Sequence, residues 1–185
     1  MEYDPSIAIQ DRDTVYPVSE DSILLIRSFN AAGNVLEIGC GSGVVSLHCA
    51  KNGCNVTAVD INPDAVNATK HNAESNGLSV NVLGSDIFSN VAGVFDTILF
   101  NLPYLPEDDE GMEAKAWSGG SDGIEPLRKV MAGLDEHLSG NGRLVIVVSS
   151  LMDQTALNDV LDGRIVKVVG ELPLFFEKLS VLEIR

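Results

Sequence analysis

Three glycines at alternate positions, between an apolar run and a helical run, are the first residues of this chain that suit binding chemistry. Gly39, Gly41 and Gly43 follow the apolar residues 35–38 and precede a helix that should begin at Val44. Because glycine has no Cβ atom, such a turn lets a ligand reach backbone N–H groups at the start of the helix. The sequence therefore predicts a ligand-binding turn at this point.

The spacing of the glycines and the acid before them indicate the kind of ligand. The dinucleotide-binding fingerprint, Gly-x-Gly-x-x-Gly, needs a glycine where this chain has Val44. Glu37, at the end of the predicted strand, would repel a pyrophosphate, so a cationic ligand without phosphates fits better. Residues 37–43 (E-I-G-C-G-S-G) resemble the S-adenosylmethionine loop of Rossmann-like methyltransferases. The resemblance implies that Glu37 and the loop, Cys40 included, face the methionyl part of that cofactor.

Two further acids stand where an adenosyl group would meet them. Asp60, followed by Ile61, ends the second predicted strand, where an acid can accept both ribose hydroxyls. Asp86 follows the third predicted strand and is placed to accept the adenine amino group, with Ile87 packing on the ring. The sequence thus predicts an adenosyl site built from the ends of neighbouring strands.

The residues that would carry out the transfer follow a strand predicted over residues 95–100. They are Asn101, Leu102, Pro103 and Tyr104. The side-chain oxygen of Asn101 and the carbonyl of Leu102 can hold both hydrogens of a planar –NH2 group and aim its nitrogen at the sulfonium methyl. Tyr104 can stack on the flat group. This run resembles the N-P-P-Y motif of amino-group methyltransferases, with Leu102 in place of the first proline, and Pro103 still favours extended backbone before it.

A third resemblance lies ahead of the first strand. Residues 16–22 (Y-P-V-S-E-D-S) are similar to the Y-x-P-x-E-D-[S/T] segment of HemK-like methyltransferases, with the proline one place early. In that family the final hydroxyl touches the cofactor, so the resemblance gives this role to Ser22 and brings Tyr16 into the site. As a local signal, Ser19 suits the N-cap of a helix and the acids after it suit the helix start.

The composition is that of an acidic chain without a metal-binding pattern. The net charge of the 185 residues is −15, which disfavours unaided binding to nucleic acid. The three cysteines, Cys40, Cys49 and Cys54, lack metal-ligand spacing and suit a reducing cytosol. The polar, acidic N-terminus does not resemble a signal peptide, and no apolar run reaches the roughly 18 residues of a membrane helix. We therefore expect a cytoplasmic protein without a metal site.

The secondary-structure signals alternate in the manner of a Rossmann-like α/β fold. Strands are predicted over 35–38, 56–60, 80–83, 95–100 and 144–148, with a closing pair over 164–169 and 175–184 joined by a loop that contains Pro173. Helices are predicted over 23–29, 44–52, 63–76, 124–137 and 152–161. We expect residues 1–185 to form a single methyltransferase domain, with residues 1–30 as lead-in and helix. Its seven-stranded sheet should be mostly parallel with an antiparallel terminal strand and helices on both faces.

Together these resemblances identify the HemK-like branch, in its short archaeal and eukaryotic form without the N-terminal helical domain of bacterial members. That branch methylates the glutamine of the Gly-Gly-Gln motif in translation termination (release) factors. The resemblance implies S-adenosylmethionine as cofactor and S-adenosylhomocysteine as product. The implied cofactor-binding residues are Tyr16, Ser22, Glu37, Gly39, Cys40, Gly41, Asp60, Ile61, Asp86, Ile87 and Asn101.

A partner is implied as well, because members of the short form commonly work with a small zinc-binding activator protein. The third strand is expected at an edge of the sheet. There the stretch from Ser79 to Leu83, with its apolar Val80 and Val82, would be open to pairing with the activator.

Three other functions stay open. An N6-adenine, N4-cytosine or RNA methyltransferase uses the same four-residue motif, but the acidic charge and the expected lack of a recognition domain oppose it. A non-catalytic cofactor-binding subunit has Leu102 as its support. An oxidoreductase is opposed by Val44 and Glu37.

The remaining polar and aromatic residues have simpler interpretations. The long connection over residues 106–123, with Trp117, suits a lid or binding loop. The histidines, His48, His71 and His137, are expected at the surface or at helix ends.

Overall fold

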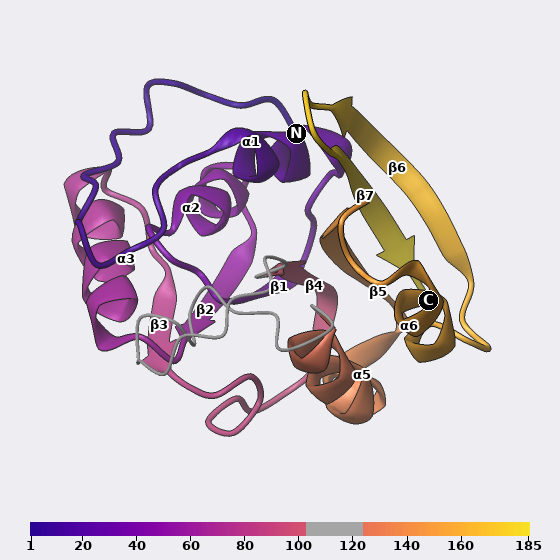
Figure 1. Ribbon diagram of the computed structural model, residues 1–185. Coiled ribbons are helices and arrows are strands. Elements are labelled where there is room, and N and C mark those ends of the chain that lie inside the picture. Colours follow the sequence, from indigo (N-terminus) through magenta and orange to yellow (C-terminus); the bar gives the residue numbers. More distant parts are fainter. Residues whose placement is uncertain (103–123) are drawn as a thin grey trace.

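A computed structural model describes residues 1–102 and 124–185 of this chain (Figure 1). The strands are β1 (Asn34–Ile38), β2 (Asn55–Asp60), β3 (Asn81–Gly84), β4 (Phe95–Asn101), β5 (Leu138–Ser149), β6 (Val166–Pro173) and β7 (Lys178–Ile184). The helices are α1 (Glu20–Ser28), α2 (Val44–Lys51), α3 (Pro63–Ser75), α5 (Glu125–His137) and α6 (Gln154–Val160).

All the strands described belong to one seven-stranded sheet in the order β3-β2-β1-β4-β5-β7-β6. Only β7 runs antiparallel to its two neighbours, and the other pairs are parallel. The predicted fold class, a mostly parallel sheet with an antiparallel terminal strand, is therefore confirmed. The parallel strands all present their carboxyl ends at one edge, which is where open α/β sheets bind ligands.

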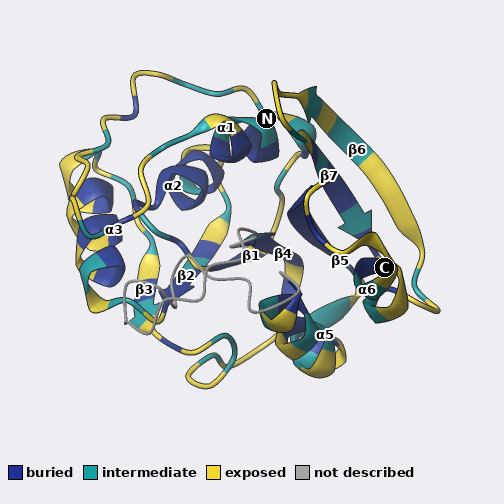
Figure 2. Ribbon diagram, viewed as in Figure 1, coloured by how far each residue is buried: buried dark blue, intermediate teal, exposed yellow. Residues whose placement is uncertain are grey.

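The buried centre of the sheet is covered by helices on both faces (Figure 2). Along β4, Ile98 and Phe100 face a cluster that contains residues of α5 and α6, whereas Leu99 faces a cluster with residues of α1 and α2. This alternation follows from the two-residue period of a strand. Because both faces of β4 are buried, residues 98–100 are all apolar. Burying each such side chain contributes roughly 1.5–3 kcal/mol, so the central strands hold their ends firmly in place.

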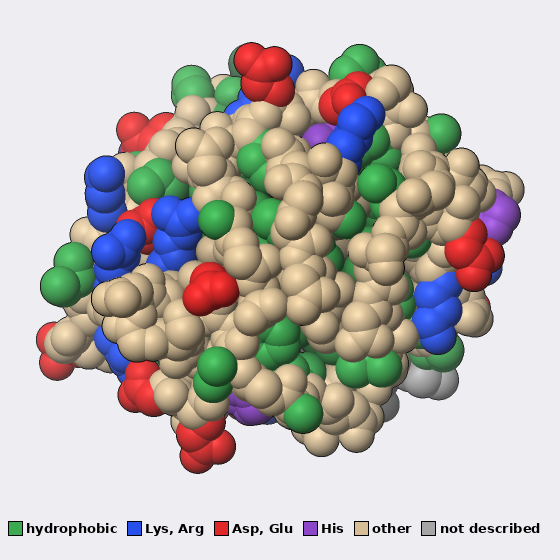
Figure 3. Space-filling model, turned by 180° about the vertical axis from the view of Figure 1, so that it is seen from behind, with side chains coloured by type: hydrophobic (Ala, Val, Ile, Leu, Met, Phe, Trp, Pro, Cys, Tyr) green, Lys and Arg blue, Asp and Glu red, His purple; other side chains and the backbone are tan. Residues whose placement is uncertain are grey.

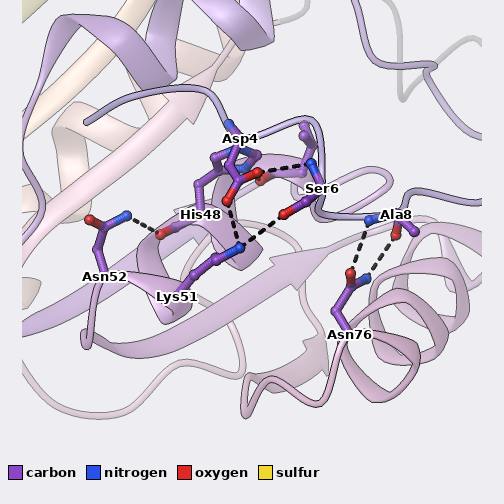
Figure 4. Close-up of polar contacts among 8 residues, drawn as sticks. Asp4, Ser6, Ala8, His48, Lys51, Asn52 and Asn76 are labelled. Carbon is purple, nitrogen blue, oxygen red and sulfur yellow. Dashed lines mark hydrogen bonds and ion pairs between the residues drawn. The ribbon is translucent and has the colours of Figure 1, made fainter.

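The N-terminal segment has no regular structure, yet it is tied to α2 and α3 (Figure 4). The backbone N–H of Asp4 donates to Nε2 of His48 at 2.9 Å, and Asp4 also pairs with Lys51. Farther along, the side chain of Asn76 accepts the N–H of Ala8 at 2.9 Å and donates to its carbonyl at 2.8 Å. His48 is buried and lies in the last turn of α2, so of its two predicted positions, the surface and a helix end, only the helix end is confirmed.

Several element boundaries differ from those predicted. Pro173 ends β6 instead of lying in the following loop, and Phe175 lies in the turn rather than in a strand. β5 begins earlier than expected, because Leu138 already pairs with Phe95 of β4. α6 begins only after Asp153, whose carboxylate caps it by accepting two backbone N–H groups. The predicted N-cap of α1, Ser19, makes no such bond with its side chain.

The strand β3 forms an edge of the sheet, as predicted, but its apolar side chains are not open. Val82 is buried and packs with Ala58 of β2 and Val66 of α3, while Val80 and Leu83 are half-buried. The expectation that these side chains are exposed is wrong, because Val80 and Val82 pack with Val66 of α3, and Leu83 packs against the core cluster on the other face of the sheet. Among the helices of the described residues, none is long and apolar enough to span a membrane.

Candidate active site

A cavity of about 440 Å³ lies at the carboxyl ends of the central strands. Every cofactor-binding residue predicted from the sequence lines it, and Leu102 does so as well. The other two residues of the predicted catalytic run, Pro103 and Tyr104, lie outside the described residues, as do Trp117 and the rest of the predicted lid. The structure thus brings the described candidates, taken from both halves of the chain, to one place.

The glycine turn has the backbone shape that only glycine adopts freely. Gly39, Gly41 and Gly43 have φ angles of 67°, 52° and 82°, in the left-handed region. At Gly43 a Cβ atom would also come within 2.8 Å of the Thr69 side chain on α3. Thr69 in turn donates its hydroxyl to the carbonyl of Gly41 at 3.0 Å. The third glycine therefore serves the packing of α3 against the turn, which explains its departure from the dinucleotide fingerprint.

Glu37 both lines the cavity and caps α2. Its Oε2 accepts the backbone N–H of Ser46 at 2.8 Å and also the Ser46 hydroxyl, supplying the acceptor that the N-cap Gly43 lacks. Burial raises the pKa of Glu37 to about 8, although the bonds from Ser46 oppose that rise. Both bonds go to Oε2, so Oε1 remains available to a ligand. A cation in the cavity would therefore meet an acid that is ready to ionise.

Asp60 lies at the tip of β2 and is nearly buried. Its Oδ2 accepts the N–H of Gly41 at 2.9 Å, and its Oδ1 accepts the N–H of Asn62 at 2.9 Å. Burial raises the pKa of Asp60, while these backbone bonds lower it. Each carboxylate oxygen has a further lone pair, so Asp60 can still accept two hydroxyls from a ligand. This pair of acceptors fits the two hydroxyls of a ribose.

The next turn places Asp86 and Ile87 at the cavity. Asp86 is exposed, and Ile87 has a φ angle of 51°, which is unusual for a β-branched side chain. The hydroxyl of Ser85 donates to the Ile87 carbonyl at 2.9 Å and holds this shape. Backbone strain of this kind costs on the order of 1–3 kcal/mol and is concentrated at ligand sites.

The first turn of α1 contributes a residue that sequence reasoning assigned only to the helix start. Asp21 is buried and lines the cavity. It accepts the hydroxyl of Tyr16 at 3.0 Å and that of Ser22 at 3.1 Å, so it joins the two predicted residues of the lead-in. Burial raises the pKa of Tyr16 to about 12, which keeps its hydroxyl protonated as a donor. Asp21 could have been predicted as a site residue because it belongs to the motif over residues 16–22.

Asn101 ends β4 with a buried acceptor that lacks a donor. Among the described residues, its Oδ1 is the buried side-chain nitrogen or oxygen atom without a hydrogen-bond partner. Its neighbours Phe100 and Leu102 are buried and apolar. An unsatisfied buried acceptor costs about 1–3 kcal/mol, and a native structure keeps one for a reason such as a catalytic role or a bound group that supplies the donor. Asn101 is therefore positioned to accept a hydrogen from a group inside the cavity.

The helix α5 adds polar side chains that the sequence did not mark. Glu125 and Lys129 line the cavity one turn apart. No motif surrounds them, and their position depends on the packing of Leu127 and Val130 against the sheet. They follow Asn101 in the chain and line the same cavity.

Comparisons with known proteins agree with this geometry. The sequence matches the Methyltransferase small domain family over residues 17–171. A protein of Methanocaldococcus jannaschii named as a protein N5-glutamine methyltransferase is 41% identical over 177 residues, which cover 91% of this chain and 90% of that protein. The release factor glutamine methyltransferase of Streptococcus pneumoniae is 30% identical over 145 residues, which cover 71% of this chain and 52% of that protein. Ribosomal RNA small subunit methyltransferases C are further relatives.

Among solved structures, the fold is similar to that in the Mtq2–Trm112 complex of E. cuniculi, which is described as responsible for methylation of the eRF1 translation termination factor. The TM-score is 0.75 at 18% identity, with 93% of this chain and 98% of that chain covered. The likeness in structure shows the fold, and the match over residues 17–171 shows the family. This chain belongs to the methyltransferase small domain family.

Proposed function

We propose that this protein transfers a methyl group from S-adenosylmethionine to the side-chain amide of a glutamine in a translation release factor. The observation that carries the proposal is the buried Oδ1 of Asn101, which has no donor among the described residues and lies in the cavity. A planar amide supplies the hydrogens that such an acceptor needs. The backbone carbonyl of Leu102, next in the chain, would accept the second hydrogen.

The described residues suit S-adenosylmethionine by their chemistry. The cavity volume of about 440 Å³ falls in the range of small-molecule sites. Glu37 would face the cationic methionyl part, Asp60 would accept the ribose hydroxyls, and Asp86 would accept the adenine amino group beside Ile87. The remaining cofactor contacts are assigned to the glycine turn, Ile61 and the lead-in residues.

In this mechanism the chain mainly positions the acceptor. When bound, the cofactor supplies an electrophilic methyl group on a sulfonium and leaves as S-adenosylhomocysteine. Asn101 and Leu102 hold the two amide hydrogens and keep the nitrogen in line with the methyl. The same two acceptors stabilise the positive charge that the nitrogen gains, and one proton then passes to solvent. Tyr104 is assigned to stack on the amide, and Pro103 to keep the acceptors extended.

A protein substrate is favoured over nucleic acid. Two of the relatives are named for glutamine methylation, and the net charge of −15 would repel phosphates. On the face shown in Figure 3, acidic side chains lie among the Lys and Arg side chains, so that face offers no continuous basic surface. The ribosomal RNA methyltransferases among the relatives make RNA the alternative to test.

The test offers both classes of substrate to the same enzyme. The protein is incubated with methyl-labelled S-adenosylmethionine and either a purified release factor, a variant of that factor with Ala for the glutamine, or ribosomal RNA. We expect label only in the unaltered release factor, and Asn101→Ala should abolish most of it. Label in RNA, or in the release factor that lacks the glutamine, would contradict the proposal. Binding of S-adenosylmethionine without label in any substrate would instead support a non-catalytic subunit.

We further propose a small zinc-binding activator protein as partner, pairing its backbone with the edge strand β3 between Ser79 and Leu83. The support is the edge position of β3 and the partner present in the Mtq2–Trm112 structure. Hydrogen exchange measured with and without the activator should show new protection over residues 79–84, and unchanged exchange there would refute this surface. We also propose that the protein works in the cytoplasm, where translation takes place, and that residues 1–185 form one methyltransferase domain.

A further inference from the structure

The turn between β6 and β7 exposes two aromatic side chains side by side. Phe175 is 91% and Phe176 85% exposed, and their rings pack edge to face with centroids 4.6 Å apart. Large aromatic side chains are usually at least partly buried, because their exposure to water is unfavourable. Side chains so exposed contribute little to folding. Their presence at the tip of a hairpin points to a contact with another molecule.

This tip, residues 174–177, is held firmly at its base. The N–H of Leu174 donates to the carbonyl of Glu177 at 2.8 Å and closes the turn. The hydroxyl of Ser149 donates to the Glu177 carboxylate. The backbone N–H of Lys178 donates to the Ser150 hydroxyl at 2.9 Å, and the Ser150 N–H donates to the Lys178 carbonyl at 2.9 Å. The carboxyl end of β5 thus anchors the hairpin, and a preorganised contact loses less entropy on binding.

The hairpin tip stands at the same edge of the sheet as the cavity. Because β7 is antiparallel to both β5 and β6, β6 ends at the carboxyl edge where β4 presents Asn101. The register places Asn101, Val147, Val181 and Gly170 in one row across four strands. In Figure 1, β6 is the outermost strand of the sheet, next to β7.

The spacing of the strands sets the scale of the distance. Three strand separations of about 4.8 Å, and about five residues of about 3.3 Å beyond Gly170, put the tip on the order of 20 Å from Asn101. A typical protein–protein interface covers about 800 Å² on each partner, a patch about 30 Å across. A folded protein that inserts an amide at Asn101 would therefore also reach the tip, whereas a free amino acid or a short peptide would not.

We propose that Phe175 and Phe176 form a docking element for the folded protein substrate, an inference that rests on the proposed function. The partner surface should be apolar, because the two side chains that the tip exposes are aromatic, while the neighbouring Lys178 already pairs with Glu171 at 2.7 Å. Aromatic side chains that enter a partner's pocket are frequent anchors of binding energy. The tip would then select a folded substrate and hold it while the cavity receives only the reacting side chain.

The test compares a double variant, Phe175→Ser with Phe176→Ser, with a matched control. Ile165→Ser removes another apolar side chain that is 74% exposed, but it precedes β6 and so lies at the opposite edge of the sheet. The probes are a purified release factor and a short peptide that carries its Gly-Gly-Gln segment. We expect the double variant to raise KM for the release factor about tenfold or more, with the loss absent from the peptide reaction. Ile165→Ser should behave as wild type in both.

The outcomes separate this inference from the proposed function. If wild type labels no release factor, the proposed function fails and the docking role fails with it. If wild type labels the factor and the double variant has the same KM, only the docking role is overturned. A lower melting temperature of the double variant would show that the tip packs on the chain itself and would also overturn it. So would a wild-type dimer that the double variant turns into a monomer, because the tip would then bind a second copy.

Discussion

The carboxylate of Asp60 accepts the backbone N–H of Gly41 with a distance of 2.9 Å between the two atoms. The acid that ends β2 is thereby fastened to the turn that follows β1. From α3, the side chain of Asn72 donates to the carbonyl of Ser42 at 2.9 Å in the same turn, and it accepts the N–H of Gln10 at 3.0 Å. The turn, the acid and the N-terminal segment therefore form one connected polar framework, and the turn and the acid line the cavity.

This framework predicts that Asp60→Ala weakens S-adenosylmethionine binding. The ribose loses its acceptor, at a cost of about 1–3 kcal/mol, or roughly 5- to 150-fold in Kd. Titration calorimetry measures the loss directly. Asp64→Asn is the control, because Asp64 accepts the Thr14 hydroxyl on the outer side of α3 and does not line the cavity. Equal affinity in Asp60→Ala and wild type would remove Asp60 from the site.

The raised pKa of Glu37 predicts proton release when the cofactor binds. In the free protein the pKa is about 8, so at pH 6.5 the carboxyl group is mostly protonated. A cation beside it favours the charged form and lowers the pKa, so binding expels a proton between the lowered pKa and about pH 8. Calorimetry at pH 6.5 in buffers of different ionisation enthalpy should show this release. Glu37→Gln keeps an acceptor for Ser46 but should show no release, and identical buffer dependence in both proteins would refute the assignment.

The buried His48 predicts a loss of stability as pH falls. Its Nε2 accepts the Asp4 N–H, so the proton is on Nδ1, which contacts the Val44 carbonyl at 2.6 Å. Burial lowers the pKa of His48 below its ordinary value of 6.5. The unfolded chain therefore takes up a proton before the folded one does, and the contribution of His48 is complete above about pH 6.5 and lost below it.

Urea unfolding at pH 7.5, 6.5 and 5.5 checks this, with His48→Gln for comparison. The free energy of unfolding of wild type should fall more steeply over this range than that of the variant. His71→Gln is a second control, because His71 is an exposed side chain on α3. Parallel curves for wild type and His48→Gln would show that His48 has no part in the pH dependence.

The local signals of the fold could be predicted because each depends on a few adjacent residues. Gly53 ends α2 with a φ angle of 85°, and Pro63 begins α3, both as expected. The end of β6 was missed because Pro173 suggested a loop. At the edge of a sheet, however, a proline can end a strand without the loss of a needed hydrogen bond. The aromatic Phe175 suggested a strand by its propensity, although it lies in the turn.

The site could be predicted where a motif carried it and not where packing did. The glycine turn, Asp60 and Asp86 could be predicted because each lies at or just after the end of a predicted strand, and all of them line the cavity. Glu125 and Lys129 reach it only because α5 packs on the sheet, which no short pattern records. The burial of His48 likewise depends on Asp4, which is distant in the sequence.

Asn101 gives the prediction that separates catalysis from cofactor binding. Its buried Oδ1 has no donor among residues 1–102 and 124–185, whereas the groups assigned to the cofactor are held by other contacts. Asn101→Ala should therefore leave the Kd for S-adenosylmethionine nearly unchanged. The target amide would lose one of its two acceptors just as the nitrogen gains positive charge, so the loss should fall on kcat. Loss of such a positioned contact typically costs 10²- to 10³-fold, or about 3–4 kcal/mol.

The companion variant Asn101→Asp tests whether acceptance alone is what the residue supplies. A carboxylate still accepts the amide hydrogen, so Asn101→Asp should retain more activity than Asn101→Ala, although it also buries a charge next to Phe100 and Leu102. Single-turnover rates with labelled cofactor and saturating release factor measure the methyl-transfer step separately from binding. A normal rate in Asn101→Ala would mean that the run beginning at Asn101 serves only as a strand end. The non-catalytic subunit would then explain the cavity better than the methyltransferase.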